Sequence, residues 1–159
     1  MDHAFQLSRT ALIDGTPEKV FALLDDPTRL GRHMAQPSAM MLGGQMQYLL
    51  GPEQDRALGA RIDIRGSFLG LRLWADQVVV ARDPPERKVW KTLPGEHLLA
   101  IGPYQLGFEM TSVDAKHVNL RVFIDYDLPS GWMGRILGTI FGGLYARWCV
   151  TSILHDAGT

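Results

Sequence analysis

The sequence predicts an α+β fold in which a curved antiparallel sheet wraps around one long C-terminal helix. The stretch from Met40 to Leu128 has no long helical period and divides into strand-like runs. It is followed by one apolar helical run, Trp132–Leu154, with Gly134, Gly138 and Gly142 at every fourth position. Glycine inside a helix costs about 1 kcal/mol relative to alanine, so we expect backbone or a ligand close to that helix face. The small helix face would leave a hollow under the sheet.

The N-terminal part predicts one strand and two short helices. Phe5–Ile13 alternates imperfectly between apolar and polar residues, which indicates a strand. A helix start follows, because Thr16 can cap the helix and Pro17 suits its first position. This helix ends before Pro27, and a second short helix is predicted from Thr28 to Met34.

Six further strands are predicted, separated by turns rich in Gly, Pro or Asp. Their spacing of about a dozen residues suits an antiparallel meander. Their ranges are Gln45–Leu50, Ala60–Leu69, Leu71–Arg82, Arg87–Leu93, Tyr104–Val113 and Val118–Leu128. Clean alternation in the last two predicts one buried and one wet face. In Leu71–Arg82 both alternating sets contain large apolar residues, so either set could face inward.

Composition favours a single globular domain over residues 1–159. The formal net charge is −1 and 46% of residues are hydrophobic, which argues against disorder and against a nucleic-acid partner. Cys149 is the only cysteine, so no internal disulfide is expected. Charged residues near the N-terminus interrupt any signal peptide, and we therefore expect a cytoplasmic protein.

The terminal helix is not expected to cross a membrane. Only eleven uncharged residues separate Arg135 from Arg147, whereas a transmembrane helix needs roughly 20 apolar residues. Transient contact with a membrane surface stays open.

Two segments resemble a known family. Ile13–Pro27 (IDGTPEKVFALLDDP) resembles the opening of START-like (SRPBCC) proteins. Tyr126–Gly131 (YDLPSG), leading into an apolar helix, is similar to the closing signature of their polyketide cyclase/dehydrase and lipid-transport branch. The resemblance implies a helix-grip fold, with a seven-stranded antiparallel sheet curled around the C-terminal helix and two short helices closing one end. It also implies a cavity for an apolar small molecule. Arg32–Met34 stands where a Trp often ends the second short helix in this branch.

No catalytic or metal-binding pattern stands out. The five histidines show no metal-ligand spacing, and no nucleophile elbow or phosphate loop is present, so we assign no catalytic residue, metal or cofactor. Glu109 and Asp125 fall on the wet side of their strands, which favours cross-strand ion pairs. Arg72, Trp74 and Asp76 share a face and would orient a ligand if that face points inward.

The expected ligand site is the space between sheet and helix. Its candidate residues combine large apolar side chains with a few polar groups: Met46, Tyr48, Arg72, Trp74, Trp90, His97, Tyr104, Phe108, Tyr126, Met133, Phe141 and Tyr145. The primary hypothesis is a carrier or sensor that binds a lipid-like or polycyclic molecule. The alternatives are a polyketide cyclase/dehydratase-type enzyme that uses the same cavity, and a partner-binding regulator. The oligomeric state is not determined by the sequence.

Overall fold

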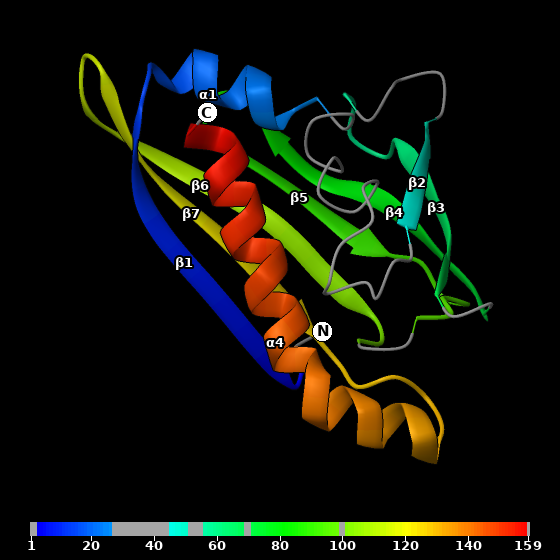
Figure 1. Cartoon of the computed structure of the whole chain (residues 1–159). Coiled ribbons are helices and arrows are strands. Elements are labelled where there is room, and N and C mark those ends of the chain that lie inside the picture. The colour runs from blue at the N-terminus through cyan, green and yellow to red at the C-terminus, as the bar shows by residue number, and fades with distance from the viewer. Residues whose placement is uncertain (1–2, 27–44, 51–55, 69–70, 99–100, 159) are drawn as a thin grey trace.

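The computed structural model describes residues 3–26, 45–50, 56–68, 71–98 and 101–158. Its elements are β1 (Phe5–Asp14), α1 (Pro17–Leu24), β2 (Gln45–Leu50), β3 (Arg61–Phe68), β4 (Leu71–Asp83), β5 (Arg87–Thr92), β6 (Tyr104–Asp114), β7 (His117–Tyr126) and α4 (Trp132–Gly158). The seven strands form one antiparallel sheet in the order β1-β7-β6-β5-β4-β3-β2. The sheet curls around α4, and α1 lies across one end of it (Figure 1).

This architecture confirms the predicted α+β class and the curled sheet on a C-terminal helix. The observed strands begin and end within two residues of their predicted bounds, and α4 continues to Gly158 instead of ending at Leu154. Thr16 caps α1 as expected, since its Oγ1 accepts a hydrogen bond from the Lys19 backbone N–H at 3.3 Å. The predicted helix over Thr28–Met34 lies outside the described residues.

The register of the strands defines the concave face of the sheet. Tyr104 pairs with Tyr126 and Phe108 with Val122 across β6 and β7, and all four side chains are buried. On β4 the buried set is Leu73, Ala75, Gln77 and Val79. This resolves the ambiguity in β4, because the alternate set with Arg72, Trp74 and Asp76 must face the convex side.

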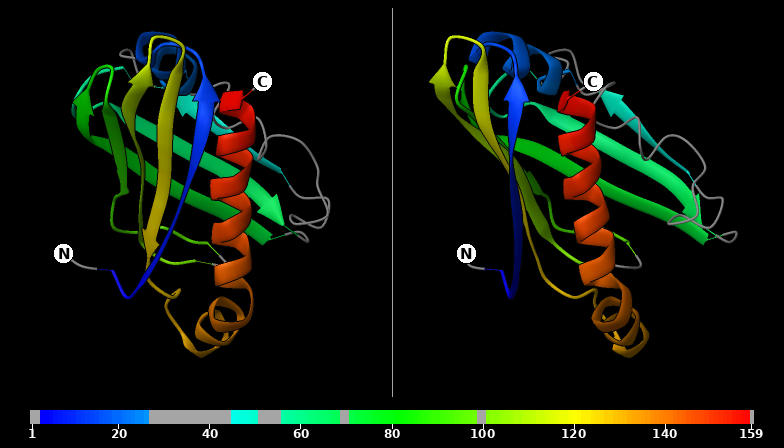
Figure 2. Two further views of the ribbon diagram at one scale, coloured as in Figure 1. Left: turned by 90° about the vertical axis from the view of Figure 1, so that its left-hand side faces the viewer. Right: turned by 60° about the vertical axis from the view of Figure 1, so that its left-hand side comes forward.

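Helix α4 packs on β1 and β7 through a row of mostly small side chains. Its buried residues are Gly138, Gly142, Ala146, Cys149, Val150, Ile153 and Ala157. Residues spaced by three or four positions share one helix face, so a helix with this row can lie close against the sheet. The first turns of α4 extend past the end of the strands, where the sheet does not cover them (Figure 2).

By length and composition α4 would also qualify as a membrane-spanning helix. Core helices of globular domains pass the same test, and the row from Gly138 to Ala157 gives α4 a buried side against the sheet. The other side of its first half carries exposed apolar residues.

Candidate functional site

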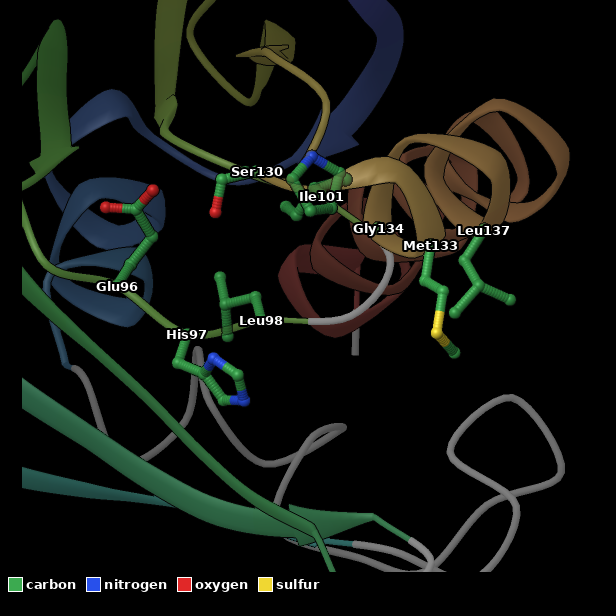
Figure 3. A pocket seen from close by; sticks show the side chains of 10 residues that line it. Glu96, His97, Leu98, Ile101, Ser130, Met133, Gly134 and Leu137 are labelled. Atoms are coloured by element: carbon green, nitrogen blue, oxygen red, sulfur yellow. The ribbon is translucent and has the colours of Figure 1, made fainter.

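A pocket of about 230 Å³ lies where the β5–β6 connection meets the start of α4. Its walls come from two segments: Glu96, His97, Leu98, Ile101 and Gly102 on one side, and Pro129, Ser130, Met133, Gly134 and Leu137 on the other. Figure 3 shows the helix side chains Met133 and Leu137 on one side of the space and Glu96, His97 and Leu98 on the other. The pocket therefore lies at the end of the sheet opposite α1.

Close backbone contacts hold the two walls together. Gly102 donates its N–H to the Asp127 carbonyl at 2.8 Å, and the Asp127 N–H reaches the Pro103 carbonyl at 2.9 Å. A Cβ added at Gly102 would lie 2.5 Å from the Leu128 carbonyl oxygen, a distance that no real side chain tolerates. A glycine at this position is needed to bring the β5–β6 connection against the segment that leads into α4.

The start of α4 explains one of the helix glycines. A Cβ at Gly134 would lie 2.9 Å from Cβ of Pro129, so the pocket wall closes against a bare helix backbone there. Gly138 and Gly142 lie in the buried row that faces the sheet. For Gly134, the close neighbour expected from the sequence is thus the protein itself.

Strand β4 fixes the position of His97. The two residues His97 and Trp74 exchange backbone hydrogen bonds of 2.7 and 3.1 Å, and their rings stack at 4.7 Å between centroids. The Trp74 indole N–H also donates to the Gly95 carbonyl at 2.8 Å. His97, a ligand-site residue predicted from the sequence, contributes to the wall of this pocket.

Two predicted cavity residues need correction. Arg72 and Trp74 are exposed and lie on the convex face of β4, so they do not point into the space between sheet and helix. The prediction failed because Trp74, Val78 and Val80 make the convex side of this strand nearly as apolar as the concave side. Trp74 contacts the pocket wall through its ring stack with His97 and its hydrogen bond to the Gly95 carbonyl.

The other predicted residues fall into three groups. Trp90, Tyr104, Phe108 and Tyr126 are buried members of the core, where Phe108 contacts both Phe21 and Trp90 at centroid distances of 5.6 and 6.0 Å. Met133 lines the pocket, Phe141 is half exposed, and Tyr145 packs against Trp148 at 5.7 Å. The side chains of Met46 and Tyr48 lie outside what the structure describes.

A buried polar cluster crosses the middle of the concave face. Gln77 on β4 donates a hydrogen bond to the hydroxyl of Tyr104, and Thr92 Oγ1 bonds the Tyr104 backbone N–H at 3.0 Å. Burial raises the pKa of Tyr104 far above its usual value, although the Gln77 hydrogen bond acts in the opposite direction. Burial also raises the pKa of nearby Cys149 to about 12, so its thiol stays protonated and unreactive at neutral pH.

At the α1 end lies a buried ion cluster that the sequence did not predict. Asp25 accepts hydrogen bonds from Lys88 Nζ at 2.7 Å and from Arg82 Nη2 at 2.8 Å, and the Lys88 side chain is fully buried. Burial alone would raise the pKa of Asp25, but the hydrogen bonds and charges of Arg82 and Lys88 outweigh it and lower that pKa below 3.8. Lys88 and the buried Trp90 are two residues apart on β5, so their side chains lie on the same face of the sheet. This spacing predicts that Lys88 points inward.

Two further carboxylates, Glu109 and Asp76, form ion pairs on the convex face of the sheet. Glu109 pairs with Arg121 at 3.2 Å and with Arg87 at 3.5 Å, and Asp76 pairs with Arg65 at 2.8 Å, all on the convex face. These pairs confirm the expected cross-strand ion pairs for Glu109. Within the part of the chain that the structure describes, no three His, Cys, Asp or Glu side chains gather as metal ligands.

No family model matches this sequence, and no curated protein matches it by sequence. Solved structures do match over nearly the whole chain. A protein from Thermus thermophilus shares 14% identity, with a TM-score of 0.67 and coverage of 97% of this chain and 94% of that one. An aromatase/cyclase from Streptomyces shares 12% identity, with a TM-score of 0.64 and coverage of 96% and 93%. Norcoclaurine synthase from Thalictrum flavum shares 11% identity, with a TM-score of 0.63 and coverage of 99% and 94%.

These neighbours define the fold class. The protein has the START-like (SRPBCC) helix-grip fold, as the resemblance of its two terminal segments predicted. At identities of 11–14% the similarity concerns the fold and not the reaction or ligand.

Proposed function

We propose that this protein binds a hydrophobic small molecule, lipid-like or polycyclic, in a pocket beside the first turns of α4, as a carrier or sensor. The observation that carries the proposal is the pocket between the β5–β6 connection and the first turns of α4. A cytoplasmic location belongs to the same proposal.

The lining of the pocket suits an amphiphilic ligand. Leu98, Ile101, Met133 and Leu137 supply apolar surface, and Met can adapt to irregular shapes. Glu96, His97 and Ser130 supply the few polar groups that would orient a ligand. At about 230 Å³ the pocket is somewhat smaller than typical drug-sized sites, so we expect it to hold one end of a longer molecule.

Ligand binding can be tested with a variant that fills the pocket. The change Leu137→Trp adds bulk where Leu137 meets the pocket, and we expect it to weaken binding about tenfold or more because the apolar volume is lost. The matched control is Leu12→Trp, at an exposed position on β1. Binding is measured by native mass spectrometry and by thermal shift against fatty acids and polycyclic aromatics.

The outcome distinguishes a pocket that binds a ligand from a pocket that binds none. The proposal requires that wild type and Leu12→Trp bind a member of the panel and that Leu137→Trp does not. An absence of both bound ligand and thermal shift for wild type across the whole panel would contradict it. Equal binding by Leu137→Trp, with its melting temperature unchanged, would place the ligand elsewhere.

The alternative function is a cyclase/dehydratase-type reaction in the same space. One observation favours it: an acid and an imidazole, Glu96 and His97, line the pocket together with the Ser130 hydroxyl. Such groups could transfer protons during ring closure or dehydration of a bound chain. This alternative predicts turnover of a polyketide-like substrate that falls in His97→Ala and Glu96→Gln while binding persists. Unchanged turnover in both variants would remove its support.

A further inference from the structure

The first half of α4 carries an exposed apolar ridge. Ile136, Ile140 and Leu144 follow one another at intervals of four residues, and each is at least half exposed, with Ile140 at 63%. They lie about half a turn from the buried row of Gly138 and Gly142, so the ridge points away from the sheet. Met133 and Phe141 widen this surface.

The surface begins with an exposed aromatic residue. Trp132 opens α4 and is 74% exposed, and the helix turns around it extend beyond the end of the sheet (Figure 2). Monomeric proteins rarely expose a continuous apolar surface of this kind without a partner. Tryptophan is enriched at the boundary between water and lipid, where its ring is apolar and its N–H stays hydrated.

The charges on the helix indicate which kind of surface it can bind. Residues 128–155 contain no Asp or Glu, although the whole chain carries one more acid than base. The same stretch holds Arg135 and Arg147, and both are exposed. A helix with an apolar ridge, flanking arginines and no carboxylate before Asp156 in its last turn complements a surface that is apolar inside and anionic outside.

We propose that the first half of α4 docks on the surface of an anionic lipid bilayer. Trp132, Met133, Ile136, Ile140 and Leu144 enter the boundary between headgroups and acyl chains, while Arg135 and Arg147 contact the headgroups. The buried row of α4 stays against the sheet, so the protein lies on the membrane and does not span it.

This orientation brings the pocket to the membrane. Met133 belongs to both the docking surface and the pocket wall, and Leu137 lies between Met133 and Phe141 on the same helix. An apolar molecule could pass between bilayer and pocket without crossing water. Docking itself goes beyond the proposed function, since it rests on the helix surface and not on which ligand is bound.

The test is vesicle co-sedimentation of the full chain. Phosphatidylcholine vesicles with and without phosphatidylglycerol are compared for wild type, the double variant Ile136→Ser/Ile140→Ser, and the matched control Leu12→Ser/Leu58→Ser. The control removes two apolar residues that are equally exposed on other parts of the molecule. We expect wild type and control to bind anionic vesicles. The ridge variant should bind at least about tenfold less, because it lacks two apolar side chains that would be buried in the bilayer.

A second variant tests the charges. We expect Arg135→Gln/Arg147→Gln to weaken binding to anionic vesicles and to leave binding to pure phosphatidylcholine unchanged. Added salt should have the same two effects on wild type, because it screens the attraction between the arginines and the headgroups. All variants must keep the wild-type melting temperature, since the changed residues are exposed.

Three results would overturn the proposal. The first is no binding of wild type to anionic vesicles, and the second is equal binding by the ridge variant. The third is a solution dimer, seen by light scattering, that the ridge changes dissociate, because a second copy would then cover the surface. Ligand affinity measured without vesicles should be the same in the ridge variant and wild type, so docking and ligand binding can fail separately.

Discussion

The two ends of the sheet differ in how they are closed. At one end, α1 covers the sheet, its residues Val20, Phe21 and Leu24 are buried, and Asp25 is held by Arg82 and Lys88. At the other end, the β5–β6 connection and the exposed first turns of α4 surround a pocket. One end combines buried apolar side chains with paired charges, whereas the other leaves apolar side chains in water.

This difference separates stability from binding. A charge inside a protein is tolerated only with partners, so the α1 end is sensitive to the loss of any one of Asp25, Arg82 and Lys88. Exposed apolar side chains contribute little to the folded state and remain available to a ligand or a surface. The comparison therefore predicts large losses of stability at the α1 end and smaller ones near the pocket.

The largest effect is expected for Asp25→Ala. This change leaves Lys88 and Arg82 without their shared carboxylate, and we expect the free energy of unfolding to fall by about 3–5 kcal/mol. Urea denaturation measures it. The control Asp76→Ala breaks the pair with Arg65 on the convex face and should cost less than about 1 kcal/mol. Equal losses in the two variants would show that the α1 end is not specially held by its charges.

An intermediate effect is expected for Gly102→Ala at the pocket. The new methyl group would collide with the backbone of Leu128, and relieving that contact should cost about 1–3 kcal/mol and shift the pocket wall. The control is Gly158→Ala, where a Cβ meets open space. Thermal denaturation of both variants checks the prediction, and a Gly102→Ala protein as stable as wild type would contradict it.

The smallest expected effect is the change in the free energy of unfolding that Asp25 causes at acidic pH. The pKa of Asp25 is lower in the folded than in the unfolded protein, so its contribution to stability is complete above the unfolded value. That contribution is lost as the pH falls through the folded pKa. We expect the gap in unfolding free energy between wild type and Asp25→Asn to be constant near neutral pH and to narrow below about pH 4. A gap that stays constant down to the acid limit of folding would exclude this role.

Much of the sheet could be predicted because its periodic signals are local. Val118, Leu120, Val122 and Ile124 alternate with mostly polar residues on β7, with Phe123 as the exception, and all four are buried as the alternation requires. Strand β4 could not be oriented in this way, since both of its faces are apolar. Its inward set even includes Gln77, whose partner Tyr104 lies 27 residues away in the sequence.

The site was harder to predict than the fold. Met133 and His97 are predicted from the sequence and line the pocket. The sequence does not predict its other lining residues Glu96, Leu98, Ile101, Ser130 and Leu137. The pocket is formed by two connections that meet through the Gly102–Asp127 hydrogen bond, and no local pattern encodes that meeting. The cluster around Asp25 has the same origin, because Lys88 lies 63 residues further along the chain.

The pairing of β1 with β7 has a consequence for how the chain folds. Among the strands that the structure describes, β1 pairs only with β7, and their register joins residues 5–14 to residues 117–126. During synthesis the first strand must therefore wait, unpaired, until the last strand has left the ribosome. Such long-range closure slows folding and leaves strand edges unpaired in the meantime. We accordingly expect nascent chains that stop before β7 to depend on chaperones.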